Sequence, residues 1–188
     1  MPPKARITKE MIIKAGLDIV RSEGAGAVNV RKIAAKLDCS TQPIMYHCKT
    51  VDELKNELCA AADEIHTQRL MRGAAASDEP MLTIGLNYIG FAAEEKHLFR
   101  FLFQSDKLKG SSFAEMMNRE ELGFLLAPLR SAAGLDDAQA RDVFGALFVC
   151  VHGIASLIAN NSMEYDKESF TRLLTLTFRG AVGYIKKT

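Results

Sequence analysis

Apolar residues recur at intervals of three and four along nearly the whole chain, and this spacing constrains the fold more than any other feature of the sequence. It places the apolar side chains on one side of a helix with 3.6 residues per turn. No stretch alternates apolar and polar residues over the length of a strand between hairpin turns. The sequence therefore predicts an all-α fold.

Capping and stop residues divide the chain into about nine expected helices. Thr8 and Asn29 are suitable N-caps, residues 50–53 have the spacing of a capping box, and Gly24 and Gly134 stand where helices should end. The expected helices span residues 8–23, 30–37, 41–47, 52–69, 80–93, 95–103, 112–132, 137–160 and 167–186.

The composition is that of a folded globular protein, with 188 residues, 48% hydrophobic and 25% charged. The start of the chain has no apolar run of signal-peptide length, and no run of about 18 consecutive apolar residues follows. We expect a cytoplasmic protein with no membrane partner. Four cysteines lie at irregular separations, so we expect reduced thiols rather than a disulfide framework: Cys39, Cys48, Cys59 and Cys150.

The net charge of +1 hides an uneven distribution. Residues 1–49 hold nine Lys and Arg against four Asp and Glu, whereas residues 50–188 hold fifteen against nineteen. A basic end on an acidic remainder indicates contact with a polyanion, because Lys and Arg supply the sequence-independent part of nucleic-acid affinity. A solvated charged face is the alternative that charge alone leaves open.

Residues 29–49 have the pattern of a helix-turn-helix. A short helix over 30–37 carries an apolar stripe, a turn follows at 38–39, and a second short helix spans 41–47. The second helix keeps Ile44 for packing and is otherwise rich in polar and aromatic residues. Two short helices joined by a turn also occur at the surface of helical proteins that bind no DNA. The types of residue on the second helix therefore decide between the two interpretations.

The outward side chains of the second helix suit the major groove of DNA. Gln42 can bond an adenine edge, and Thr41 and Pro43 can contact a thymine methyl group. Tyr46 and His47 can bond phosphate oxygens. These residues predict a recognition helix.

This N-terminal region resembles the TetR family of transcriptional regulators over about residues 7–54. The resemblance rests on the spacing of the two helices, the pairs 33–34 and 42–43, and the Glu53-Leu54 pair that enters the fourth helix. It implies that DNA is contacted by a set of residues in and beside the second helix: Arg31, Ser40, Thr41, Gln42, Pro43, Met45, Tyr46, His47 and Lys49.

The sequence also departs from the family pattern at four positions. Asp38 stands where Gly is usual, Met45 where Tyr is usual, Cys48 where an aromatic residue or Val is usual, and Val51 where Lys is usual. The last change removes one expected phosphate contact. Tyr46 can take over the role of the aromatic residue displaced at Met45.

The resemblance implies two functional parts. Residues 1–50 would form the DNA-binding domain, and residues 51–188 a ligand-binding and dimerisation domain, with 51–72 as the connecting helix. The last two helices, over 137–160 and 167–186, would pair with their counterparts in a homodimer. A two-fold dimer predicts a palindromic double-stranded operator. The family's usual behaviour is that of a repressor released by a small molecule.

Aromatic and methionine residues of the larger part are candidates to line an apolar ligand cavity with a few polar groups such as Asn87. The segment His152-Gly153 resembles the His-Gly pattern of one TetR-like C-terminal subgroup, although the usual Trp is absent. Plain core packing is the alternative for each candidate. The predicted ligand-binding residues are Tyr88, Phe91, Phe103, Met117, Phe124, Phe148 and His152.

Other classes of function have less support. A thiol- or metal-responsive regulator is the main alternative, because Cys39, His47 and Cys48 all belong to the DNA-reading region, yet no CxxC or compact ligand spacing exists. No phosphate loop, nucleophile elbow, HExxH or dinucleotide fingerprint occurs, so we expect no enzyme, no catalytic residue, no cofactor and no metal site. A ligand-independent DNA-binding protein also stays open.

Overall fold

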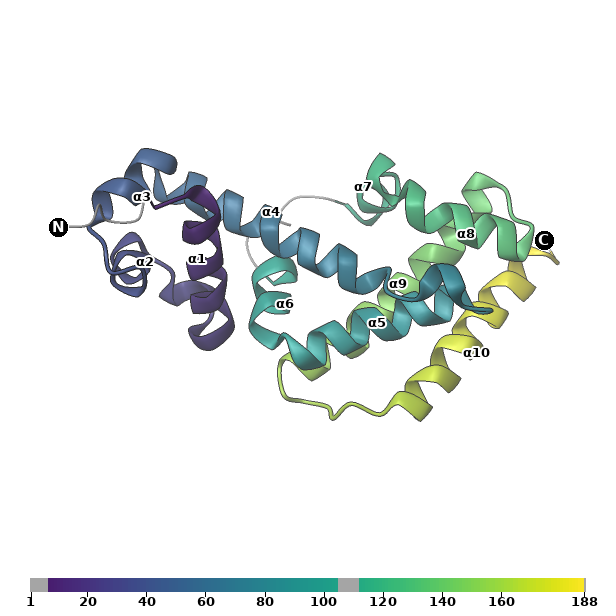
Figure 1. Cartoon of the computed structure of the whole chain (residues 1–188). Coiled ribbons are helices and arrows are strands. Elements are labelled where there is room, and N and C mark those ends of the chain that lie inside the picture. The colour runs from purple at the N-terminus through teal and green to yellow at the C-terminus, as the bar shows by residue number, and fades with distance from the viewer. Residues whose placement is uncertain (1–6, 105–111, 188) are drawn as a thin grey trace. The chain divides into compact units, whose positions relative to one another are not determined.

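A computed structural model describes residues 7–104 and 112–187, which form ten α-helices and three short 3-10 helices without a strand (Figure 1). The predicted all-α fold is confirmed. The helices are α1 (Lys9–Glu23), α2 (Val30–Lys36), α3 (Thr41–His47), α4 (Val51–Leu70), α5 (Pro80–Glu94), α6 (Lys96–Phe103), α7 (Phe113–Met117), α8 (Gly123–Ala133), α9 (Asp137–Ala159) and α10 (Lys167–Ile185).

The described residues divide into two compact units. The first unit comprises residues 7–67 and 95–104, and the second comprises residues 68–94 and 112–187. Helix α4 runs through the boundary, with its last three residues in the second unit. These units do not test the predicted functional domains, a DNA-binding domain of residues 1–50 and a ligand-binding and dimerisation domain of residues 51–188, which stay a prediction.

In the first unit, α1 packs against α2, α3 and α6. Its core contains the fully buried side chains of Ile12, Ile33, Ile44 and Leu58. A Cβ atom added to Gly16 would lie 2.6 Å from Cδ2 of Leu58, so the glycine permits a close approach of α1 to α4. This core holds the helix-turn-helix in place.

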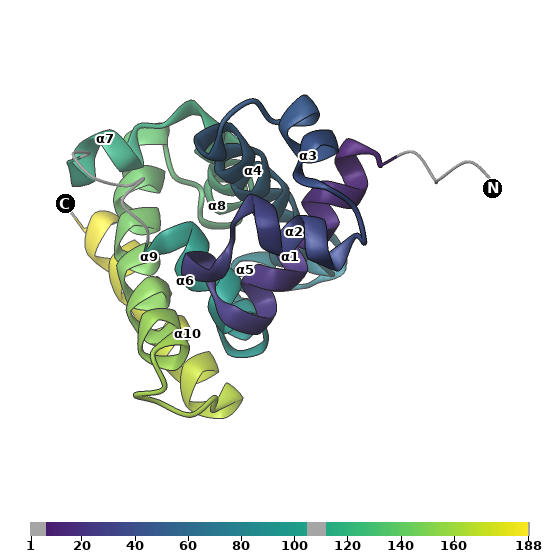
Figure 2. The same ribbon diagram turned by 90° about the vertical axis from the view of Figure 1, so that its left-hand side faces the viewer.

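In the second unit, α9 is the central helix and packs against α5, α8 and α10. Figure 2 shows α10 running beside α9. By length and composition α9 is apolar enough to cross a membrane, and half of its most apolar stretch is buried inside the structure. A core helix passes the same test, and the contacts of α9 on three sides are those of a core helix.

Most predicted helix ends are confirmed. Thr8 accepts a hydrogen bond from the Met11 N–H, and Asn29 accepts one from the Lys32 N–H. Gly24 and Gly134 end α1 and α8 with φ of 85° and 61°, values that glycine adopts without steric cost.

The capping box at the start of α4 differs from the expected form. The Thr50 hydroxyl accepts from the Glu53 N–H, as expected, at 3.0 Å. The Glu53 carboxylate, however, accepts from the N–H of Lys49 at 2.7 Å rather than from Thr50. The carboxylate therefore ties the residue after α3 to the first turn of α4.

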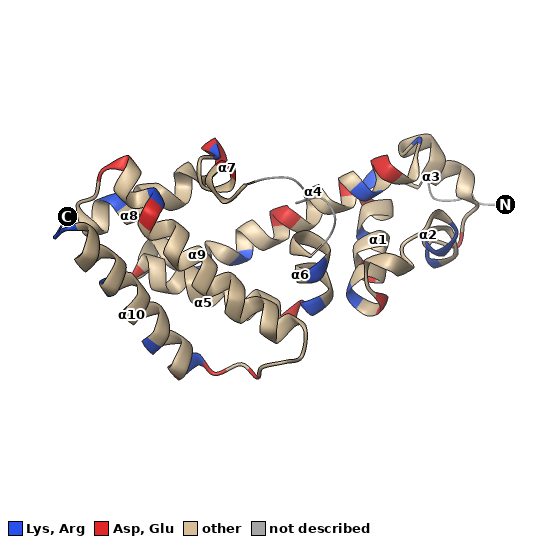
Figure 3. Ribbon diagram, turned by 180° about the vertical axis from the view of Figure 1, so that it is seen from behind, with Lys and Arg blue, Asp and Glu red and all other residues tan. Residues whose placement is uncertain are grey.

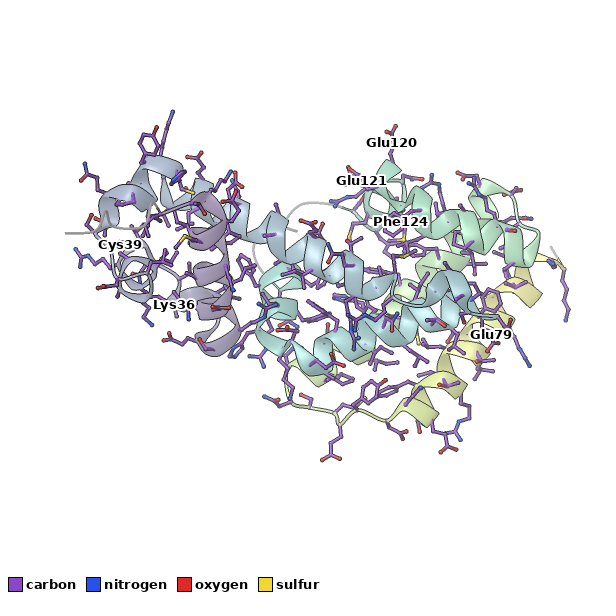
Figure 4. The ribbon with its side chains drawn as sticks, viewed as in Figure 1. Lys36, Cys39, Glu79, Glu120, Glu121 and Phe124 are labelled. Atoms are coloured by element: carbon purple, nitrogen blue, oxygen red, sulfur yellow. The ribbon has the colours of Figure 1, made fainter. Side chains whose placement is uncertain are left out.

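The single helix expected over 112–132 is wrong, and this accounts for ten helices in the described residues instead of about nine. The segment forms α7, a 3-10 turn at Glu120–Leu122, and α8. One continuous helix would place Glu121 on the same face as the buried Met117 and Leu125, which are four residues away on either side. The break leaves Glu121 exposed, and Figure 4 shows Glu120 pointing away from the helices.

Candidate nucleic-acid interface

The turn between α2 and α3 depends on a left-handed residue. Asp38 has a φ of 49°, and the Cys39 N–H donates to the Ala34 carbonyl at 3.0 Å. Aspartate enters this region more readily than most non-glycine residues, because its short polar side chain can form local hydrogen bonds. The departure from glycine therefore keeps the backbone form that a tight turn requires.

Helix α3 is anchored by one apolar residue and exposes the rest of its surface. Ile44 is fully buried, while Thr41 and Gln42 are exposed and Tyr46 is 77% exposed. Pro43 is half-buried in the first turn. The helix carries no Lys, Arg, Asp or Glu (Figure 3). It therefore offers mainly hydrogen-bonding and apolar groups to a partner, and its basic side chain is that of His47 in the last turn.

The basic side chains around α3 differ in their partners. Among the described residues, no ion pair engages Arg31 or Lys49, and both side chains are exposed. Lys4 and Arg6 of the basic segment lie outside the described residues. Four other basic residues are already paired with carboxylates of the first unit: Lys9 with Glu57, Arg21 with Glu95, Lys32 with Glu23, and Lys36 with Asp18.

His47 is half-buried and already holds a hydrogen bond. Its Nε2 lies 3.2 Å from the carbonyl oxygen of Ile7. Because a carbonyl only accepts, Nε2 carries the proton of the ring. A hydrogen bond from His47 to a phosphate oxygen would therefore have to come from Nδ1 or replace the hydrogen bond to Ile7.

Three further positions of this region have specific surroundings. Ser40 is exposed and precedes α3 with extended backbone, but its side chain makes no capping hydrogen bond within the described structure. Met45 and Val51 are 38% and 44% exposed. Apolar surface thus stands at the two positions where the family pattern has Tyr and Lys.

The cysteines of the first unit do not form a compact donor set. Burial raises the pKa of the Cys48 thiol, and the nearby Glu53 carboxylate raises it further. A thiol with a raised pKa is a poor nucleophile and a poor metal ligand at neutral pH. Among the described residues, no group of three or more His, Cys, Asp or Glu side chains is placed to hold a metal ion.

The structure brings three of the predicted ligand-binding residues together. The hydroxyl of Tyr88 lies 2.9 Å from Nδ1 of His152, and the Phe148 ring stacks on His152 with centroids 5.3 Å apart. Burial raises the pKa of Tyr88 and lowers that of His152. Both groups are therefore neutral at pH 7, with the hydroxyl donating to Nδ1.

The other predicted ligand-binding residues lie apart from this cluster. Phe103 belongs to the first unit, where its ring meets His66 with centroids 5.0 Å apart. Phe91 and Met117 are buried in the second unit, and Phe124, labelled in Figure 4, is 45% exposed. The Asn87 side-chain amide instead donates hydrogen bonds to the backbone carbonyls of Leu70, the last residue of α4, and of Arg72.

Exposed apolar residues lie on α9 and α10, the two helices that the sequence analysis expects to pair in a homodimer. Val149 and Leu157 of α9 are 58% and 44% exposed, and Leu173, Leu176 and Tyr184 of α10 are 41%, 67% and 71% exposed. We call these five residues the α9/α10 face. On α10 they form a second stripe beside the buried Phe170 and Leu174. Two apolar stripes on one helix are the sequence signal that identifies such a face.

A tight helix-turn-helix with an outward polar helix, followed in the chain by a larger α-helical unit, defines the class of helix-turn-helix regulators. The chain belongs to the TetR family of transcriptional regulators. Residues 81–177, more than half of the chain, match the family described as Tetracyclin repressor-like, C-terminal domain.

Solved structures agree with this assignment at the level of the fold. A TetR-like transcriptional regulator from Rhodococcus sp. RHA1 is 17% identical, with a TM-score of 0.65 over 97% of this chain and 99% of its own. A TetR family member from Streptomyces coelicolor A3 is 20% identical, with a TM-score of 0.59 over 89% and 96% of the two chains. The multidrug binding protein EbrR, complexed with imidazole, is 18% identical, with a TM-score of 0.57 over 89% and 88%. No curated protein matches the sequence.

Proposed function

We propose that this chain is a transcriptional repressor that binds a palindromic operator as a homodimer and is released by a small molecule. Residues 1–50 would read DNA, and residues 51–188 would bind the ligand and form the dimer, with 51–72 as the connecting helix. The observation that carries the proposal is the outward surface of α3, where Gln42 and Tyr46 are exposed above the fully buried Ile44.

The proposed contacts fall into two groups. Thr41, Gln42 and Pro43 lie in the first turn of α3 and would meet base edges, which specify sequence. Residues at the margins would meet phosphates, which position the protein without reading sequence: Arg31, Ser40, Met45, Tyr46, His47 and Lys49. Met45 would touch the backbone through apolar contact only.

The α9/α10 face supports the proposed homodimer. Exposed apolar side chains grouped on neighbouring helices mark protein interfaces, whereas scattered ones do not. Gly153 of α9 and Gly180 of α10 have open space where a Cβ would stand, so they would let a second copy approach closely. A two-fold pair would place two copies of α3 on successive turns of the DNA.

The cluster of Tyr88, Phe148 and His152 supports a ligand site in the larger domain. It combines flat aromatic surface with two neutral polar groups, which suits an uncharged aromatic compound better than an ion. The structural neighbour EbrR is a multidrug binding protein, and this favours a ligand of the same general kind. Ligand binding would shift α4, and with it α3, toward an arrangement with lower operator affinity.

The first experiment is the selection of DNA from a random library by the purified protein, followed by affinity measurements across salt concentrations. We expect a palindrome. Gln42→Ala should relax the base preference at one position per half-site, by about 1–3 kcal/mol. Tyr46→Phe should weaken binding to all sequences alike. Ser131→Ala, at an exposed serine on α8, is the control and should bind as the wild type does.

Selection of no sequence, with unchanged binding by Gln42→Ala and Tyr46→Phe, would contradict the regulator proposal. The release step has its own test. Small aromatic compounds that raise the melting temperature of the wild type but not of His152→Ala should weaken operator binding. Compounds that stabilise the protein and leave operator affinity unchanged would instead indicate a ligand-independent DNA-binding protein.

A further inference from the structure

An open groove lies on the first unit, where α1 runs past the second half of α4. Its volume is about 390 Å³, which is within the range of small-molecule sites. Its apolar floor is formed by Ile13 and Leu17 of α1 and by Ile65 of α4, and all three belong to the first unit. Leu17 is buried, whereas the two isoleucines are half-buried and keep part of their apolar surface open to a ligand.

The groove lies next to the close approach of α1 to α4. A Cβ atom added to Gly16 would lie 2.6 Å from Cδ2 of Leu58. Ile65 follows Leu58 by seven residues, close to two helical turns, so both side chains lie on the same side of α4. The two helices therefore touch at Leu58 and leave room for a ligand beside Ile65.

Basic side chains surround the apolar floor. Lys9, Lys14 and Arg21 line the groove from α1, and the carboxylate among the lining residues is that of Glu10. Lys and Arg cover apolar surface with their aliphatic stems while the charged head stays in water. The groove therefore combines an apolar floor with positive charge at its margin.

Lys14 is the cation best placed to meet an anion. Lys9 pairs with Glu57 at 2.8 Å, and Arg21 pairs with Glu95 at 3.1 Å. Lys14 is exposed and takes part in no ion pair within the described residues. Its ammonium group can therefore bind a ligand without giving up a carboxylate of the protein.

The Glu10 carboxylate is engaged at the start of its own helix. Hydrogen bonds from its own N–H and from the Thr8 hydroxyl lower its pKa. The N-terminal end of a helix also stabilises a negative charge. Glu10 therefore opposes an anion beside Lys14 less than a carboxylate without such partners would.

We propose that this groove binds a small amphipathic carboxylate, with the carboxylate beside Lys14 and the tail on the apolar floor. Seven residues of α1 separate Lys14 from Arg21, a rise of about 10 Å, which suits an extended chain of medium length. The groove belongs to the unit that carries α3, whereas the Tyr88–His152 cluster belongs to the second unit. The inference does not depend on the proposed function.

The test uses octanoate as the probe and follows the isoleucine methyl signals of the whole protein by NMR. We expect the signals of Ile13 and Ile65 to shift in a saturable way as octanoate is added. The same shifts should remain in His152→Ala, because the groove and the Tyr88–His152 cluster belong to different units.

Lys14→Gln should weaken octanoate binding about threefold, the contribution of an exposed ion pair. It should leave the binding of octanol unchanged, since octanol has the same chain without the charge. Lys55→Gln is the matched control, because it removes an exposed lysine of the first unit that does not line the groove. Ile65→Ser should weaken octanoate and octanol alike, by at least about threefold, because part of the apolar floor is lost.

Octanoate that shifts other isoleucine signals and leaves Ile13 and Ile65 unchanged would overturn the site. Equal losses of octanoate affinity in Lys14→Gln and Lys55→Gln would overturn the role of Lys14, because binding would then follow net charge. A protein that selects no operator would refute the proposed function, while the octanoate titration, which needs no DNA, would still decide whether the groove is a binding site.

Discussion

The exposed surfaces of α3 and α10 differ in kind. Helix α3 buries one residue, Ile44, and exposes hydrogen-bonding side chains with a single large aromatic ring. Helix α10 buries Phe170 and Leu174 and still exposes apolar residues of large size. The first surface suits a polar partner with specific acceptors and donors. The second suits another apolar helix.

Because the two surfaces differ, substitutions of opposite charge test their proposed roles. An added negative charge on α10 removes apolar complementarity, while an added positive charge near α3 increases attraction to phosphate. If the two faces have the proposed roles, each substitution should alter one property and leave the other unchanged.

The largest effect is expected from Leu176→Glu on α10. Leu176 is 67% exposed, and a two-fold interface would bury the new carboxylate twice without a partner. We expect dimerisation to weaken by at least about 3 kcal/mol, which sedimentation or light scattering would detect as monomer. Met11→Glu, on an exposed apolar residue of α1, is the control and should remain dimeric. A Leu176→Glu protein that stays dimeric would place the interface elsewhere.

The second prediction compares one histidine from each unit, the buried His66 and the half-buried His152. Burial lowers the pKa of His66, in the first unit, to about 4. In the unfolded chain His66 therefore takes up a proton near pH 6.5, whereas in the folded protein it does so only near pH 4. The contribution of His66 to the free energy of unfolding is therefore greatest above pH 6.5. It should fall as the pH drops from 6.5 to 4, by up to about 3 kcal/mol from His66.

His66→Leu should remove most of this pH dependence, as measured by denaturant unfolding at a series of pH values. His152→Leu is the comparison in the second unit. Burial lowers the pKa of His152 as well, but His152 is half-buried and accepts a hydrogen bond from Tyr88. His152 should therefore contribute less than His66 to the fall in the free energy of unfolding with decreasing pH. If the free energy of unfolding falls equally with pH in wild type and His66→Leu, the pKa of His66 is not lowered by burial.

The sequence predicted those parts of the fold that depend on neighbours along the chain. Helix positions, the caps at Thr8 and Asn29, and the helix ends at Gly24 and Gly134 follow from local spacing and backbone preference, and each was found. The separation of α7 from α8 was missed, because it depends on whether Glu121 would be buried by another helix. That is a property of packing, which periodicity alone does not contain.

The candidate site shows the same limit. Exposure of Gln42 and Tyr46 around a buried Ile44 followed from the helical pattern. Two hydrogen bonds could not be predicted from the sequence, one between His47 and Ile7 and the other between Tyr88 and His152. They join residues that are 40 and 64 positions apart. No local rule relates such pairs. Residue types identified the candidates, and only the tertiary structure identified their partners.

A smaller effect is expected from Val51→Lys, which adds a charge where α4 begins. Val51 is 44% exposed and stands where the family pattern has Lys. One added phosphate contact should steepen the dependence of log affinity on log salt by about 0.9 and tighten operator binding several-fold at low salt. Gln68→Lys adds the same charge at the other end of α4 and should leave the slope unchanged. Equal slopes for the two variants would mean that Val51 lies away from the DNA backbone.

The smallest effect concerns two turns with the same backbone form. Asp38 precedes α3 with a φ of 49°, and Gly134 ends α8 with a φ of 61°. An L side chain in this region costs about 1–2 kcal/mol, and glycine offsets part of the gain through its greater freedom in the unfolded chain. Asp38→Gly should therefore stabilise the protein by only about 0.5 kcal/mol, and Gly134→Asp should destabilise it by a similar amount. Thermal unfolding would measure both. A destabilising Asp38→Gly would mean that the aspartate side chain makes a local hydrogen bond that outweighs the strain, and the turn before α3 would then owe its shape to that side chain.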